Sequence, residues 1–123
     1  MPKHEILRVE KPWGYELIWA KTKDYVGKIL HINKGHQLSL QYHKIKEETF
    51  FLNSGTMNLI FENDKGELEE IIMNAGQAKH IPPGKKHRMI AVEDCTVFEV
   101  STPQLDDVVR LEDGYGRKGT SKP

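Results

Sequence analysis

Short stretches in which apolar and polar residues alternate recur about every ten residues along the chain, separated by turn-forming residues. A period of two places successive side chains on opposite faces of an extended strand. Many short strands at this spacing are typical of an all-β sandwich or barrel, so we expect almost no helix. The expected strands are Glu16 to Trp19, Val26 to Ile32, Leu38 to Tyr42, Thr49 to Leu52, Met57 to Phe61, Leu68 to Met73, Ala78 to Ile81, His87 to Val92 and Thr96 to Ser101.

The residues between these stretches favour tight reversals of the chain. Asn53 to Gly55 and Asn63 to Gly66 supply Gly or Asn where a turn needs positive φ, and Pro82 to Gly84 fixes a further turn. Tight turns join antiparallel neighbours, so we expect an antiparallel sheet. After the last strand, Asp106 to Arg110 is expected to form one helical turn within a loose C-terminal tail over residues 106–123.

Chain length and charge exclude several classes of function. The 123 residues give room for one domain and too little for a second. The 18 Lys and Arg are balanced by 18 Asp and Glu spread along the chain, whereas nucleic-acid binding normally requires a clustered basic surplus. We therefore expect a single domain over residues 1–123 with no nucleic-acid partner.

Cysteine usage and the N-terminal charges favour the cytoplasm. Cys95 is the only cysteine, so it cannot form an internal disulfide, and a buried thiol in a reducing compartment is the simplest interpretation. Charged residues, among them Lys3, Glu5 and Arg8, interrupt any apolar run long enough for a secretory signal or a membrane span. We expect a cytoplasmic protein without a membrane partner.

Four side chains are spaced to bind one metal ion. Gln41 and His43 lie two residues apart in an expected strand, so their side chains share one face. Glu48 begins the next strand, and His87 begins another, which a barrel would bring from the opposite wall. Taken singly, each is more often a surface or hydrogen-bonded residue. Together their nitrogen and oxygen donors suit a divalent zinc, manganese, iron, cobalt or nickel ion.

The residues around these ligands resemble the two motifs of the cupin superfamily. Residues 35–55 carry the glycines, the His and the Glu of the first motif at its spacing, with Gln41 in place of the first histidine. Residues 76–91 carry the second motif, with Ala91 in place of its final asparagine. The resemblance implies an antiparallel jelly-roll barrel, the double-stranded β-helix, around one metal ion.

Further segments resemble one branch of that superfamily, the C-terminal domain of type II mannose-6-phosphate isomerases, which usually follows a mannose-1-phosphate guanylyltransferase. The similarity extends over residues 9–117 and implies zinc as the metal and a sugar phosphate as the small-molecule substrate. It implies an aldose–ketose isomerase acting on mannose 6-phosphate or a relative. The segments that carry it are Val9 to Glu16, Leu38 to His43, Ser54 to Thr56, Ile81 to Gly84, His87 with Arg88, and Val109 to Arg117.

Cationic side chains are the candidates for handling an anionic substrate. Lys46 stands where the family typically has an arginine, and it keeps the charge without the planar two-pronged donor. Alternation turns Arg88 away from the metal, so a salt bridge is an equal alternative. The candidate catalytic residues are Lys46, Arg88 and Arg110. The candidate substrate-binding residues are Lys85, Lys86, Tyr115 and Arg117. The general base is left open among Lys46, Glu47, His36 and His80.

Two other functions fit the same ligand set. A non-catalytic barrel that binds a sugar or small anion needs only the pocket, and an iron-dependent oxygenase needs only a different metal. Binding without turnover would identify the first, and oxygen consumption the second. A homodimer is expected, because exposed barrel edges commonly pair.

Overall fold

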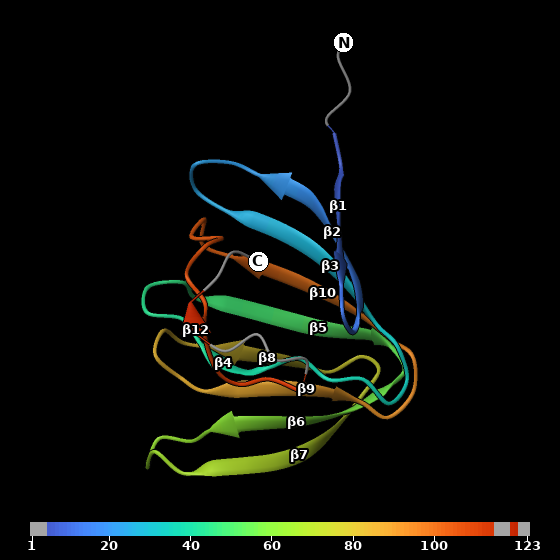
Figure 1. Ribbon diagram of the computed structural model, residues 1–123, viewed down its shortest axis with the longest axis vertical. Coiled ribbons are helices and arrows are strands. Elements are labelled where there is room, and N and C mark those ends of the chain that lie inside the picture. The colour runs from blue at the N-terminus through green and yellow to red at the C-terminus, as the bar shows by residue number, and fades with distance from the viewer. Residues whose placement is uncertain (1–4, 115–118, 121–123) are drawn as a thin grey trace.

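The computed structural model describes residues 5–114 and 119–120, and every helix or strand within them is a β-strand (Figure 1). The all-β prediction is therefore confirmed. The strands are β1 (Leu7–Lys11), β2 (Gly14–Lys21), β3 (Val26–Ile32), β4 (Leu40–Tyr42), β5 (Glu48–Ser54), β6 (Thr56–Glu62), β7 (Leu68–Asn74), β8 (Ala78–Ile81), β9 (His87–Ala91), β10 (Cys95–Ser101), β11 (Val109–Glu112) and β12 (Gly119–Thr120).

Two six-stranded sheets form the walls of the barrel. One has the order β1-β2-β3-β10-β5-β8 and the other the order β12-β11-β4-β9-β6-β7, and all their pairings are antiparallel. The chain changes sheet between β3 and β4 and again between β4 and β5. Residues close in sequence, such as Gln41 on β4 and Glu48 on β5, therefore face each other from opposite walls. The predicted antiparallel jelly roll is confirmed.

The predicted helical turn at Asp106 to Arg110 is wrong. Val109 and Arg110 instead begin β11, which pairs with β4 so that Arg110 stands directly opposite Gln41. The open edge of β4 supplies hydrogen-bond partners that the local sequence does not reveal. The edge strand β1 was also not predicted, because Arg8 and Glu10 conceal a short alternating pattern on its exposed side.

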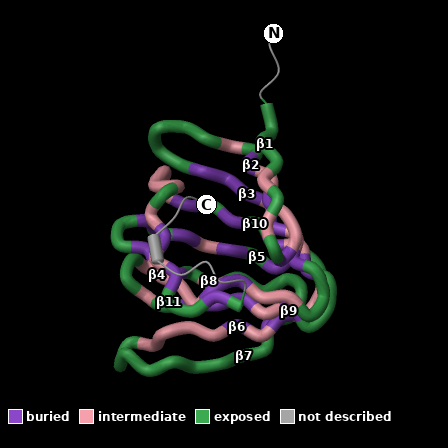
Figure 2. Tube along the Cα trace, viewed as in Figure 1, coloured by how far each residue is buried: buried purple, intermediate pink, exposed green. Residues whose placement is uncertain are grey.

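Alternation along the inner strands builds the core (Figure 2). On β10, the inward-facing Cys95 and Val97 are fully buried, whereas Phe98 and Val100 face outward. Burial raises the pKa of the Cys95 thiol, and Sγ donates to the carbonyl oxygens of Thr56 and Glu93. Cys95 is thus a buried core thiol, as expected from the sequence. Beyond Val97, the inward positions of β10 become polar, and there the core opens into a cavity.

A tight glycine turn joins β5 to β6, and it yields a stability prediction. Gly55 has a φ of +90°, and a Cβ there would lie 2.2 Å from the Asp94 carbonyl oxygen. Gly35 has a similar φ of +81°, but nothing lies within 4 Å of its Cβ position. We expect Gly55→Ala to lower the free energy of unfolding by about 3 kcal/mol or more, and Gly35→Ala by only about 1 kcal/mol. Urea unfolding of both variants measures the difference, and equal losses would contradict it.

The outer face of the sheet that contains β5 and β10 exposes apolar side chains. The rings of Phe51 and Phe98 stack with centroids 6.3 Å apart, and Val100 is 55% exposed. The homodimer expected from the sequence stays a prediction. None of the described residues belongs to a helix long and apolar enough to cross a membrane.

Candidate metal centre

Two imidazoles converge on one carboxylate inside the barrel. Nε2 of His87 lies 2.9 Å from Oε1 of Glu48, and Nε2 of His43 lies 3.3 Å from the same oxygen. Candidate ligand atoms of all three residues lie within 4.8 Å of one another, and each residue is at most 5% exposed. This is a spacing at which one ion can reach all three donors.

Each histidine is held by its other ring nitrogen. Nδ1 of His43 bonds to the backbone carbonyl of Asp107, and Nδ1 of His87 bonds to the carbonyl of Lys85 at 3.0 Å. A carbonyl can only accept, so Nδ1 carries a proton in both rings and Nε2 is the nitrogen left to bind a metal. Metal-ligating histidines are usually oriented in this way, through the nitrogen that does not bind the metal.

Gln41 reaches the same cavity through strand register. It stands opposite His87 on β9 and opposite Arg110 on β11. Directly opposed residues in antiparallel strands share a face, and all three side chains line the cavity. The four predicted ligands are therefore brought to one cavity by β4, the segment after it, β5 and β9.

The cavity is small and strongly polar. Its volume is about 60 Å³, enough for roughly four to six water molecules. Apolar side chains such as Trp13, Leu30 and Met89 form part of its wall. The charged residues that line it are Lys11, Glu16, Lys28, Lys46, Glu48, Glu99 and Arg110. Four cations against three carboxylates favour an anionic ligand, more so when a divalent ion is bound.

The buried charges shift one another's pKa values. Burial alone would raise the pKa of Glu48, but Lys46 and the two histidines lower it well below its usual range. Burial would lower the pKa of Lys46, but Glu99 and Glu48 raise it. The pKa of Glu99 is raised, first by burial and then by the Glu48 charge. At neutral pH, Lys46 is thus an ammonium and Glu48 a carboxylate.

Comparison with known proteins identifies the family to which this cavity belongs. Residues 2–113 match the family described as Mannose-6-phosphate isomerase C-terminal. The chain belongs to this family. It is 34% identical to the xanthan biosynthesis protein XanB of Xanthomonas campestris pv. campestris over 116 residues. That alignment covers 89% of this chain and 24% of XanB. It is 33% identical over 121 residues to the mannose-1-phosphate guanylyltransferase of Escherichia coli K12, covering 94% of this chain and 24% of that protein.

The chain thus spans about a quarter of the length of these relatives. Solved structures agree on the fold. Oxalate decarboxylase from Bacillus subtilis superposes with a TM-score of 0.75 at 15% identity, over 87% of this chain and 30% of that chain. KdgF from Halomonas sp. superposes with a TM-score of 0.69 at 21% identity, over 81% and 88% of the two chains. The resemblance to cupins and to the isomerase domain is confirmed.

Several predicted site residues of this isomerase-family domain lie away from the cavity. Arg88 is buried, but its Nε donates to the carbonyl of Leu38, and its guanidinium bonds to the Glu112 side chain and carbonyl. Lys85 Nζ donates to the Asn63 carbonyl, and Lys86 is exposed. None of these three lines the cavity. Tyr115 and Arg117 lie outside the described residues.

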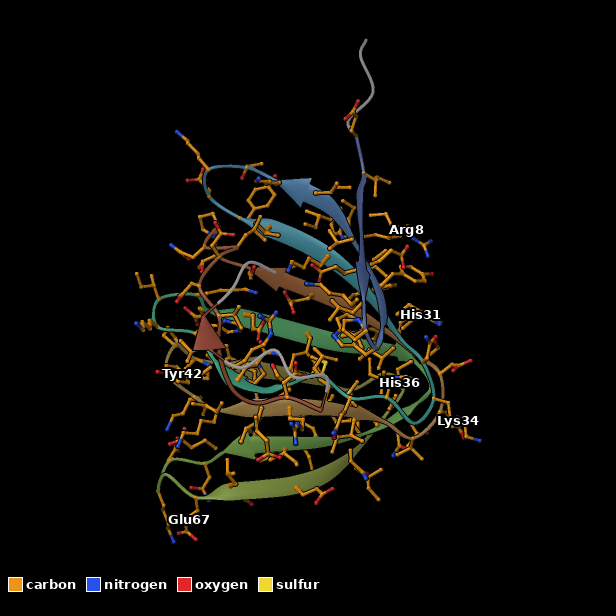
Figure 3. All side chains as sticks on the ribbon, viewed as in Figure 1. Arg8, His31, Lys34, His36, Tyr42 and Glu67 are labelled. Carbon is orange, nitrogen blue, oxygen red and sulfur yellow. The ribbon has the colours of Figure 1, made fainter. Side chains whose placement is uncertain are left out.

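The candidate bases also separate. Of the four, only Lys46 lines the cavity. Glu47 and His80 pair with each other at 2.6 Å on the surface. Tyr42, which lies between the ligands Gln41 and His43 in the sequence, is on one side of the barrel in Figure 3. His36 is on the opposite side.

Several buried charges were not predicted from the sequence, and Glu99 is the most important of them for chemistry. Glu99 lies on β10 and is 5% exposed, and its carboxylate is 3.4 Å from Lys46 Nζ. It follows the inward-facing Val97 by two positions. A charged residue at an inward position of an otherwise apolar strand is the signal that would have found it. Lys28 on β3 and Glu16 on β2 carry the same signal.

Asp107 holds the segment that connects the ligand strands β4 and β5. Its carboxylate accepts from the backbone N–H groups of Lys44, Ile45 and Lys46, which lower its pKa although burial opposes this. Its own carbonyl orients His43. Asp107→Ala should therefore weaken the binding of a divalent metal ion about 10- to 100-fold, the usual cost of losing a residue that orients a ligand. Competition with a chelator measures this, with Asp106→Ala as control; equal affinities would contradict it.

Proposed function

We propose that this domain is a metal-dependent sugar-phosphate isomerase that interconverts an aldose and a ketose, with mannose 6-phosphate as the preferred aldose. One observation carries the proposal: His43 and His87 direct Nε2 onto Glu48 within a buried cavity. That cavity belongs to a chain of the mannose-6-phosphate isomerase C-terminal family. The activities of the longer relatives are not transferred by family membership alone, because the chain spans only a quarter of them.

The donor set fits a divalent ion. An amide oxygen from Gln41, imidazole nitrogens from His43 and His87, and the Glu48 carboxylate would hold it, and zinc suits such a set. When bound, the ion supplies a Lewis acid that polarises the carbonyl and hydroxyl oxygens of an open-chain sugar. The Asp107 and Lys85 carbonyls hold the Nδ1 side of each ring, so that Nε2 is the nitrogen turned toward the proposed ion.

Glu99 is our candidate for proton transfer. Aldose–ketose interconversion moves a proton from the carbon beside the carbonyl to the former carbonyl carbon. Glu99 lines the cavity close to the ligand Glu48, and Nζ of Lys46 lies 3.4 Å from each of the two carboxylates. Its carboxylate can accept the proton and return it to the neighbouring carbon. The Lys46 ammonium adds positive charge where negative charge develops on the sugar oxygens.

The size of the cavity limits how the substrate enters. About 60 Å³ is less than a whole sugar phosphate occupies. The reacting end would therefore enter the cavity while the phosphate stays at its mouth. Arg110, which lines the cavity opposite Gln41, is the cation best placed to meet the substrate from the second sheet.

The proposal is tested by incubating zinc-loaded protein with fructose 6-phosphate in D₂O and following products by NMR. We expect mannose 6-phosphate with deuterium at C2, because the transferred proton exchanges with solvent on the carboxyl group. A protein that holds zinc and binds the sugar phosphate but forms no aldose would be a binding domain, and the isomerase proposal would be wrong.

A further inference from the structure

Six buried side chains of alternating charge cross the inner wall of one sheet from β5 to β1. All of them line the cavity, and none of these side chains is more than 8% exposed. We call this row the charge ladder. In order from the metal centre it consists of Glu48, Lys46, Glu99, Lys28, Glu16 and Lys11.

The contacts along the ladder are loose. Lys46 Nζ lies 3.4 Å from both Glu48 and Glu99, Lys28 Nζ lies 3.4 Å from Glu16, and Lys11 Nζ lies 3.9 Å from Glu16. Charge-assisted hydrogen bonds between nitrogen and oxygen normally measure about 2.7 to 2.9 Å. The contacts are therefore longer than optimal, and each ammonium, with three N–H donors, can also donate to a ligand oxygen.

Burying the charges of the ladder costs free energy of desolvation. Buried ion pairs seldom stabilise a fold more than apolar residues of the same volume would. Only the Glu48 end can bind the metal, so the ligand set does not explain why Lys28, Glu16 and Lys11 are buried. Charged residues retained in a cavity wall at this cost are expected to act on a ligand.

A polar atom on the facing wall also points to a ligand. Ser39 precedes the metal ligand Gln41 by two positions, lines the same cavity and is 1% exposed. Its hydroxyl has no hydrogen-bond partner among the described residues. A buried hydroxyl without a partner is costly, and a bound ligand would remove that cost.

We propose that Lys28, Glu16 and Lys11, together with Ser39, bind the hydroxyl groups of an extended, acyclic polyol chain. This inference rests on the proposed function and assigns these residues to the sugar carbons remote from the metal. A hydroxyl both donates and accepts, so successive hydroxyls match alternating carboxylates and ammonium groups. A dicarboxylate of similar size would instead meet Glu16 and Glu99 with like charge. The ladder thus selects an open-chain sugar over a small organic acid.

The test uses a ligand that cannot react. Glucitol 6-phosphate is a linear hexitol phosphate without a carbonyl, so its binding is independent of isomerisation. Calorimetry on the zinc-loaded full chain compares it with inorganic phosphate. We expect the wild type to bind glucitol 6-phosphate at least about tenfold more tightly than phosphate, because charged hydrogen bonds to the hydroxyls add to the phosphate contacts.

The decisive variant is Glu16→Gln with Lys28→Met, which removes one cation and one anion together so that the net charge of the ladder is unchanged. Its affinity for glucitol 6-phosphate should fall roughly 10- to 100-fold, while its affinities for phosphate and zinc stay within about twofold. Ser39→Ala removes a single hydroxyl with little risk to folding, and should weaken glucitol 6-phosphate alone by about three- to tenfold. Lys23→Met, on an exposed loop, is the control and should change neither affinity.

Unchanged glucitol 6-phosphate affinity in both ladder and serine variants would overturn the inference. So would a wild type that binds glucitol 6-phosphate no better than phosphate. These outcomes are distinct from failure of the isomerase proposal: a protein that binds the hexitol phosphate through the ladder but never forms an aldose retains the polyol site and loses only the reaction.

Discussion

His87→Ala should purify with less than about a tenth of the zinc that the wild type holds, and should bind added zinc at least roughly a hundredfold more weakly. Losing a residue that merely orients a ligand costs about 10- to 100-fold, and losing the ligand itself should cost more. His87 supplies the Nε2 closest to Glu48, at 2.9 Å, and is 2% exposed. Elemental analysis and chelator competition measure the loss.

The matched control is His80→Ala. His80 also lies beside a glutamate, with Nε2 2.6 Å from Glu47, but its side chain is 53% exposed on the surface. Its removal should leave zinc content unchanged. If His80→Ala lost the metal and His87→Ala kept it, the ion would belong to the surface pair and the proposed centre would be wrong.

Glu99→Gln should lower kcat/KM for isomerisation by about 10² to 10⁴, the usual contribution of a positioned acid–base group. The amide keeps the shape of the side chain but cannot accept the proton. Lys46 keeps its contact with Glu48 at 3.4 Å, so the site should remain folded. Rates are measured with a coupled assay on zinc-saturated protein.

Zinc content separates a loss of chemistry from a loss of the site. Glu99→Gln should keep a full equivalent of zinc, because Glu99 is not among the proposed ligands. Glu69→Gln, an exposed glutamate on β7, should leave the rate unchanged. A Glu99→Gln variant with full activity would show that another group moves the proton.

The candidate metal ligands were predictable because the features that mark them are local in the sequence. Two ligands two residues apart share a strand face, and glycines at fixed spacing mark the turns that aim the others. Gly35 and Gly55, which bound the first motif, both adopt positive φ, as such turns require. The sequence could therefore indicate His43, Glu48 and His87 without showing how the sheets pack.

The polar wall opposite β4 was less predictable, because its residues are brought together only by sheet order. Lys28 and Glu99 lie far apart in the chain and become neighbours through the pairing of β3 with β10. In sequence they read as isolated charges within apolar strands. Arg88 is the opposite case, a predicted site residue that lies away from the cavity. The resemblance to the family made it a candidate, but strand alternation turns it toward Leu38 and Glu112.

The strand β11 illustrates a different limit. Val109 to Glu112 is short and is followed by a glycine-rich tail, so its local pattern carries little information. It becomes a strand because the edge of β4 is available to it, and this pairing is what brings Arg110 beside Gln41. The position of Arg110 therefore depends on pairing with a distant strand, which the local sequence does not indicate.

Anomalous diffraction at the zinc absorption edge, from crystals of zinc-loaded protein, would test most directly whether the four side chains share one ion. A single strong peak is expected about 2.0 to 2.2 Å from Nε2 of His43, Nε2 of His87 and a carboxylate oxygen of Glu48, with the Gln41 amide oxygen completing the set. A peak at the surface pair of Glu47 and His80, or none inside the barrel of fully loaded protein, would contradict the proposed centre.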